Sequence, residues 1–104
     1  MNLTVRDRLA LTLVLPEKGR MIEMIIVDSI ISMTKLSIEE ISKYQVYDSL
    51  SGQTVFNESL TVDLEVDFTA EQVELLKKRF DALDEQGAIT KDMVRLYQKV
   101  QSLK

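Results

Sequence analysis

The segment from Arg20 to Lys35 is the most apolar part of the chain, and it restricts the folds that the chain can adopt. Only four residues between Met21 and Met33 are polar: Glu23, Asp28, Ser29 and Ser32. On a helical wheel the apolar side chains cover an arc of roughly 200°, which is wider than the single stripe of an ordinary surface helix. Such a helix either lies in the centre of the domain or is shared with a partner. Because many of its residues are β-branched, a buried strand over part of the segment is an alternative.

The same segment supplies the candidate interface of the protein. Methionine side chains are flexible and suit binding faces that adapt to a partner, although each one taken alone is better explained as a core residue. The candidate interface residues are Met21, Met24, Val27, Ile30 and Ile31. The expected partner is an unidentified protein or a second copy of the chain. A second copy would make the protein a homo-oligomer, through this helix or through the helical hairpin predicted at the C-terminal end.

Capping boxes predict two further helices in the N-terminal half. Thr4 with Asp7 begins the first helix, and the turn PEKG ends it. The apolar stripe that should face the core consists of Val5, Leu9 and Leu13. Ser37 with Glu40 begins the second, a short helix over residues 37–43.

The residues after this helix change to the period of a β-strand. Residues 44–47 and 54–57 are predicted strands, joined by the turn SLSGQ. Residues 60–67 alternate strictly between apolar and polar side chains, which makes them the clearest strand prediction in the chain. A small antiparallel sheet of two or three strands is therefore expected.

Two matched apolar stripes predict an antiparallel helical hairpin at the C-terminal end. Thr69 caps the first of its helices, Gly87 lies where a C-terminal cap glycine belongs, and Thr90 caps the second. The stripes are Val73, Leu76, Phe80 and Leu83 in the first helix, and Met93, Leu96, Val100 and Leu103 in the second.

The stretch FDALDEQGAITKDM, at the turn of this hairpin, has the rhythm of an EF-hand calcium loop. With Gly87 at the glycine position of the loop, however, Ala82 and Met93 occupy the first and last ligand positions. If the loop begins at Asp81 instead, Leu83 occupies a ligand position and Gln86 occupies the glycine position. The stretch is better explained as a helix cap, a turn and a helix start. A weak cation site remains as a minor alternative, formed by Asp81, Asp84 and Glu85.

Composition excludes several kinds of chemistry. The chain contains no cysteine and no histidine, so thiolate or imidazole metal ligands and serine–histidine triads are absent. Its three glycines are isolated, so no glycine-rich phosphate loop is present. The paired carboxylates, Glu39 with Glu40, Asp63 with Glu65, and Asp84 with Glu85, are best explained as solvated surface. We therefore expect a protein that is not an enzyme, with no cofactor and no metal.

Charge and motif content also bear on nucleic-acid binding. Three helices followed by a hairpin is the element order of a winged helix, in which residues 37–43 would be the recognition helix. That helix carries Glu39 and Glu40, the hairpin tip has no Arg or Lys, and the net charge is −4. These features disfavour contact with phosphates. A winged-helix-type DNA-binding regulator is kept as the alternative function.

The first residues share some features with a targeting signal. Arg6 and Arg8 precede the apolar run Leu9–Leu15, which is the outline of a signal peptide. The run is short, Thr12 interrupts it and no small-residue cleavage site follows, so a folded helix is predicted instead. No run approaches the length of a transmembrane helix. The expected location is the cytoplasm, without membrane association.

Several motifs together resemble a group of small uncharacterised phage and prophage proteins. They are RLALTLVLPEKGRM, SIEEI, TVFN, and FTAEQVELLKKRFDALDEQGAIT with LYQKV, and they span most of the chain. The motifs consist of caps and turns, and the resemblance implies no activity and no functional residue. It implies an accessory protein that works by binding something.

Together these patterns predict one domain over residues 1–104 with a mainly helical α+β fold. Three N-terminal helices precede a small antiparallel sheet, and a C-terminal antiparallel helical hairpin follows it. The predicted function is that of a small non-catalytic interaction protein.

Overall fold

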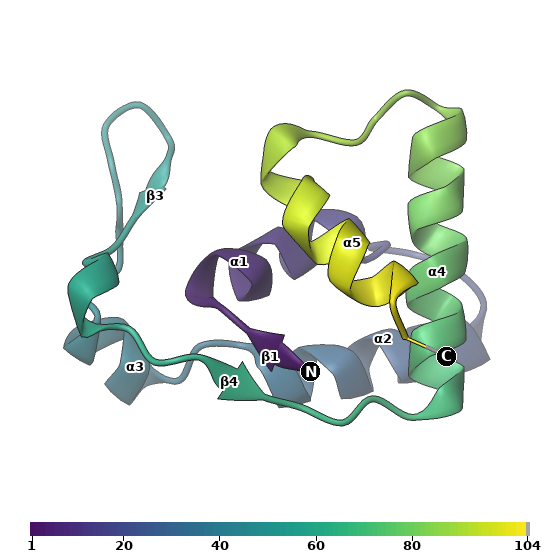
Figure 1. Ribbon diagram of the computed structural model, residues 1–104, viewed down its shortest axis with the longest axis horizontal. Coiled ribbons are helices and arrows are strands. Elements are labelled where there is room, and N and C mark those ends of the chain that lie inside the picture. The colour runs from purple at the N-terminus through teal and green to yellow at the C-terminus, as the bar shows by residue number, and fades with distance from the viewer. Residues whose placement is uncertain (104) are drawn as a thin grey trace.

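The computed structural model describes residues 1–103 and shows a mainly helical α+β fold (Figure 1). Its elements are β1 (Asn2–Leu3), α1 (Val5–Val14), α2 (Met21–Thr34), α3 (Ile38–Lys43), β2 (Tyr47–Asp48), β3 (Thr54–Val55), β4 (Leu64–Glu65), α4 (Ala70–Glu85) and α5 (Val94–Gln101). Two short 3-10 helices, Glu58–Leu60 and Lys91–Met93, precede β4 and α5. The predicted order of three helices, small strands and a helical hairpin is confirmed, and α2 is a continuous helix.

Three helices begin with the capping boxes that the sequence predicts. In each box the first side chain accepts a hydrogen bond from the backbone of the fourth residue, whose own side chain accepts one in return. The boxes are Thr4 with Asp7, Ser37 with Glu40, and Thr69 with Gln72. Each cap contributes roughly 0.5–2 kcal/mol by satisfying backbone N–H groups that have no partner within the helix.

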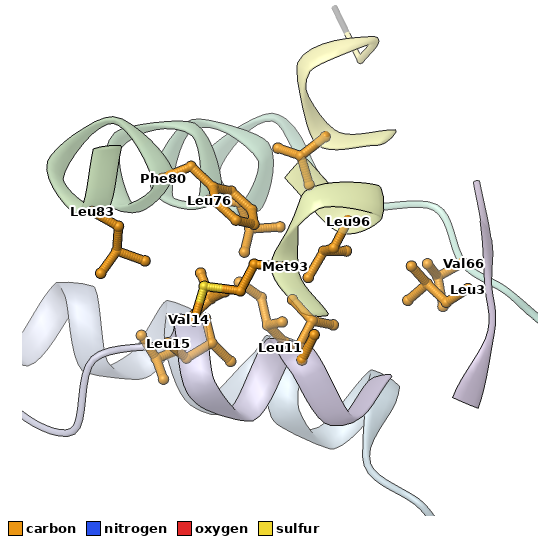
Figure 2. Packing of buried hydrophobic residues seen from close by; sticks show 14 residues of the cluster. Leu3, Leu11, Val14, Leu15, Val66, Leu76, Phe80, Leu83, Met93 and Leu96 are labelled. Atoms are coloured by element: carbon orange, nitrogen blue, oxygen red, sulfur yellow. The ribbon is translucent and has the colours of Figure 1, made fainter. Parts of the chain in front are cut away.

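The core lies between α1 and the C-terminal helical hairpin (Figure 2). Phe80 of α4 is completely buried and meets the ring of Tyr97 edge-on at 5.3 Å between centroids. Figure 2 shows Met93 between the side chains of α4 and those of α1. The predicted stripe of α4 is buried, as are Met93, Leu96 and Val100 of the second stripe. These two stripes therefore supply much of the core, and little of their apolar surface is left for a partner.

The stripe predicted for α1 is right at Val5, which is 2% exposed, but wrong beyond it. Leu13 is 59% exposed and Leu9 only partly buried, whereas Leu11 and Val14 face the core. Asp7 lies on the same side of α1, because it precedes Leu11 by four residues and Val14 by seven. A charged residue thus belongs to the buried face, and a pattern of apolar residues alone misses that face.

The strands form two separate two-stranded sheets instead of one. Strand β1 pairs antiparallel with β4, and β2 pairs antiparallel with β3 in a hairpin that stands away from the helices (Figure 1). Of the predicted strand over residues 60–67, only Leu64–Glu65 is a strand. A strand needs a hydrogen-bonding neighbour, and β1 offers only two residues before α1 begins. Val62 is accordingly 61% exposed.

The first strand of the hairpin begins later than predicted. Tyr44 is the buried C-cap residue of α3, and Gln45 has a positive φ of 56° that turns the chain. The hairpin strands are therefore confined to Tyr47–Asp48 and Thr54–Val55.

The segment FDALDEQGAITKDM forms a helix end and a turn, as predicted. Helix α4 ends at Glu85, and Gly87 adopts the left-handed φ of 66° that glycine tolerates best. Thr90 precedes the 3-10 helix, but its side chain makes no capping hydrogen bond, so that detail of the prediction is wrong. Within residues 1–103 the structure brings together no group of three Asp or Glu side chains that could hold a metal ion.

Candidate functional site

The outward face of α2 is the surface that stands out in the structure. Helix α2 packs against α4 through one side, which contains Val27, Ile30 and Thr34. On the opposite side three large apolar side chains are mostly exposed: Met21 (76%), Ile22 (73%) and Ile25 (61%). We call these three residues the α2 patch. Exposed apolar residues that lie singly are ordinary, but three within five residues of one helix form a continuous surface.

The residues predicted as an interface are divided between the two sides of α2. Val27 and Ile30 lie in the core with 2% and 0% exposure, so they are not available to a partner in this fold. Met24 packs against the edge of the core. Met21 at 76% and Ile31 at 38% are the exposed members of the set.

Sequence reasoning missed Ile22 and Ile25, although the polar residues of α2 could have indicated Ile25. Asp28 and Ser32 mark the outward side of the helix, because a charged residue and a serine are rarely buried without partners. Met21 and Ile25 precede Asp28 by seven and three residues and therefore lie on the same side. All four side chains are exposed in the structure. The N-terminal half of this side is thus apolar, and its C-terminal half is polar.

Hydrogen bonds from Gln72 of α4 reach α2 at Ser29 and Met33, which lie between its buried side and the α2 patch. The side-chain amide of Gln72 donates to the Ser29 hydroxyl at 2.9 Å and lies 3.3 Å from the sulfur of Met33. Ser29 in turn donates to the carbonyl of Ile26 at 2.6 Å. These bonds restrict rotation of α2 about its own axis. The α2 patch therefore faces solvent in a defined direction.

Arg8 joins the C-terminal end of α2 to α1 and α3. Its guanidinium is buried and donates to the carbonyls of Thr34 and Lys35 at 2.8 and 2.9 Å. It also donates to both carboxylate oxygens of Glu40, at 2.6 and 2.9 Å. The hydrogen bonds from Arg8 lower the pKa of Glu40 from its ordinary 4.5 to about 2, although partial burial acts in the opposite direction. A bidentate pair of this kind fixes geometry as well as charge.

A second buried carboxylate connects the two ends of the chain. Asp7 is 2% exposed, and its Oδ2 accepts a hydrogen bond from Lys99 Nζ at 2.5 Å. Lys99 also donates to the carbonyl of Asn2 at 2.9 Å. Within residues 1–103 every buried side-chain nitrogen and oxygen has a hydrogen-bond partner. Asp7 and Arg8 are therefore explained as structural groups, and both acquire partners distant in sequence.

Two grooves lie elsewhere on the surface. One, of about 480 Å³, separates α2 from α4 and is lined by charged side chains that are partly paired, such as Lys78 with Glu74 at 3.3 Å. The other, of about 900 Å³, lies between α1 and the β2–β3 hairpin and has Leu13 and Val94 in its lining. At its edge Arg6 forms an ion pair with Glu58 and covers the ring of Phe56. Their charged side chains are of both signs, so neither groove selects a ligand of one charge.

In this structure the features that a winged helix would use on DNA carry one exposed basic side chain, Lys43 of α3, and are otherwise acidic or neutral. In α3, Glu39 is exposed and Glu40 is engaged by Arg8. The hairpin tip, residues 49–53, carries no basic side chain. An exposed carboxylate at the start of the recognition helix would repel phosphates.

Comparison with protein-family models, with curated proteins and with solved structures finds no match. Among the described residues, no helix combines the length and apolar character needed to span a bilayer.

Proposed function

We propose that this chain is a small non-catalytic protein-interaction module that binds another protein chain through the α2 patch. The observation that carries the proposal is the exposure of Met21, Ile22 and Ile25 on a helix whose other side is anchored in the core. The exposed fractions amount to about two whole side chains, and covering them contributes about 4 kcal/mol. The patch contains no titratable group, which suits binding rather than catalysis.

The surroundings of the patch support the same proposal. Arg20 and Asp28 flank the patch with charges of opposite sign, and both are exposed. Interfaces commonly combine an apolar centre with a polar rim of this kind. The resemblance to small phage and prophage proteins agrees with a cytoplasmic accessory protein that acts by binding.

Site-specific photo-crosslinking in the source organism tests the proposal. A photoreactive residue is placed at Ile25, and in a control protein it replaces Leu50, which is fully exposed and lies at the hairpin tip. We expect a defined protein adduct from position 25 and none from position 50. Equal adducts from both positions, or no protein adduct from position 25, would contradict the proposal.

The same cells distinguish the alternative DNA-binding function. Purification with and without nuclease shows whether nucleic acid accompanies the protein. A direct DNA affinity that falls steeply with salt would favour the regulator over the interaction module.

A further inference from the structure

We infer that the partner of the α2 patch is a second copy of this chain, with the two α2 helices antiparallel across a twofold axis. The inference rests on the proposed function and deepens it by naming the partner. In a twofold dimer the same surface is used by both copies, so the surface must be complementary to itself. The distribution of charge along α2 meets this requirement in one orientation only.

The two charges that decide the orientation are Arg20 and Asp28. Arg20 is the N-cap residue of α2, and Asp28 lies eight residues later, on the outward side. That separation corresponds to about 12 Å along the helix axis, with the α2 patch between the two charges. Both side chains are exposed, and neither forms an ion pair with any residue in the range 1–103.

An antiparallel arrangement centred at the level of Met24, halfway between Arg20 and Asp28, brings opposite charges together at both ends. Arg20 of one copy then lies level with Asp28 of the other, and the twofold axis repeats the pair. Between the pairs, Ile25 lies within about 3 Å along the axis of its own symmetry equivalent, and Met21 within about 3 Å of Ile25 of the other copy. In a parallel arrangement Arg20 would lie beside Arg20 and Asp28 beside Asp28. Like charges placed opposite each other suppress that alternative.

The size of the surface sets the expected strength of the dimer. Besides the patch, Ile31 and Met33 at the flanks of α2 are 38% and 37% exposed. The exposed apolar area of the α2 patch with Ile31 and Met33 lies in the range of roughly 300–600 Å² that is typical of large surface patches. A standard interface buries roughly 800 Å² per partner, so the polar rim has to supply the remainder. We therefore expect a reversible dimer with a Kd on the order of micromolar.

Sedimentation equilibrium of charge-exchange variants tests this geometry. Arg20→Asp makes both ends of the surface negative, and Asp28→Arg makes both ends positive. We expect each variant alone to dimerise at least about tenfold more weakly than the wild type, because like charges now face each other. A mixture of the two variants should form a heterodimer, and the double variant R20D/D28R should dimerise again. Glu39→Arg, on exposed α3, is the matched charge control and should dimerise like the wild type.

The mixing experiment keeps the result independent of folding. Both substitutions are at exposed positions, and two misfolded variants would not recover dimerisation when combined. A wild-type protein that stays monomeric up to millimolar concentration would overturn the inference that the partner is a second copy of the chain. In that case a protein adduct from position 25 would still support the proposed function, whereas the absence of an adduct would end both. A dimer that neither single variant weakens would overturn the antiparallel α2 contact.

Discussion

Replacing Glu40 by glutamine is expected to destabilise the fold by about 2 kcal/mol at neutral pH. The pKa of Glu40 is lowered from 4.5 to about 2 by the hydrogen bonds from Arg8, and this difference corresponds to about 3 kcal/mol. The Glu40 side chain is 28% exposed, so solvent screens part of this energy. Glutamine keeps a side-chain acceptor for the capping box with Ser37, so the variant mainly removes the charge.

The pH dependence follows from the direction of the shift. Because the pKa of Glu40 is lower in the folded protein than in the unfolded chain, the stabilisation is fully present above pH 4.5. It is lost as the pH falls from 4.5 towards 2, where the carboxylate takes up a proton. The difference in stability between the wild type and the Glu40→Gln variant should therefore be largest near pH 7 and less than half as large at pH 3.

Urea denaturation at several pH values measures both effects, with Glu39→Gln as the matched control. Glu39 lies beside Glu40 in the first turn of α3 and loses the same helix-dipole interaction, but its side chain is exposed and does not bind Arg8. The reasoning is refuted if the two variants lose the same stability. It is also refuted if the deficit of Glu40→Gln is as large at pH 3 as at pH 7.

Three further predictions concern the core and the backbone. Phe80→Ala should cost about 3–5 kcal/mol in urea denaturation, because a fully buried ring leaves a cavity; a cost under about 1 kcal/mol would contradict this packing. Gly87→Ala should lower stability by about 1 kcal/mol or more, because alanine is strained at a φ of 66°. Gly19→Ala is the control, because an added Cβ at Gly19 meets only ordinary van der Waals contacts, and it should change stability by less than about 0.5 kcal/mol. Equal losses at both glycines would refute the role assigned to the backbone conformation of Gly87. Val66→Thr should lower the melting temperature, because Val66 is 7% exposed and the new hydroxyl would be buried. Val62→Thr should leave the melting temperature nearly unchanged, because Val62 is exposed. A larger loss from Val62→Thr would instead support the strand predicted over residues 60–67.

Helix boundaries depend on interactions between residues close in sequence, and the sequence therefore predicts them well. A capping box joins residues three apart. The 3-4-3 spacing of Val73, Leu76, Phe80 and Leu83 specifies one side of a helix without reference to the rest of the fold. The turn at Gly87 is equally local, because its glycine tolerates the left-handed backbone that ends α4.

The candidate site was predictable only in part, because the direction in which α2 faces is not a local property. The sequence shows that its apolar arc is too wide for one neighbour. Packing against α4 decides which side of α2 is buried. Val27 and Ile30 lie in the core, whereas Ile22 and Ile25 remain exposed. A helix so rich in apolar residues has several orientations of similar burial, and hydrogen bonds such as that between Gln72 and Ser29 distinguish among them.

Local sequence patterns alone specify most helix boundaries, the apolar stripes of the C-terminal hairpin and the absence of cysteine and histidine chemistry. How distant residues meet depends on the folded chain. Asp7 pairs with Lys99, which lies 92 positions later in the chain, and Arg8 pairs with Glu40, which lies 32 positions later. The alternating segment over residues 60–67 is a strand only where β1 lies beside it. Local patterns arise from backbone hydrogen bonds and helix periodicity, whereas burial of a charge or extension of a strand depends on a partner that only the folded chain supplies.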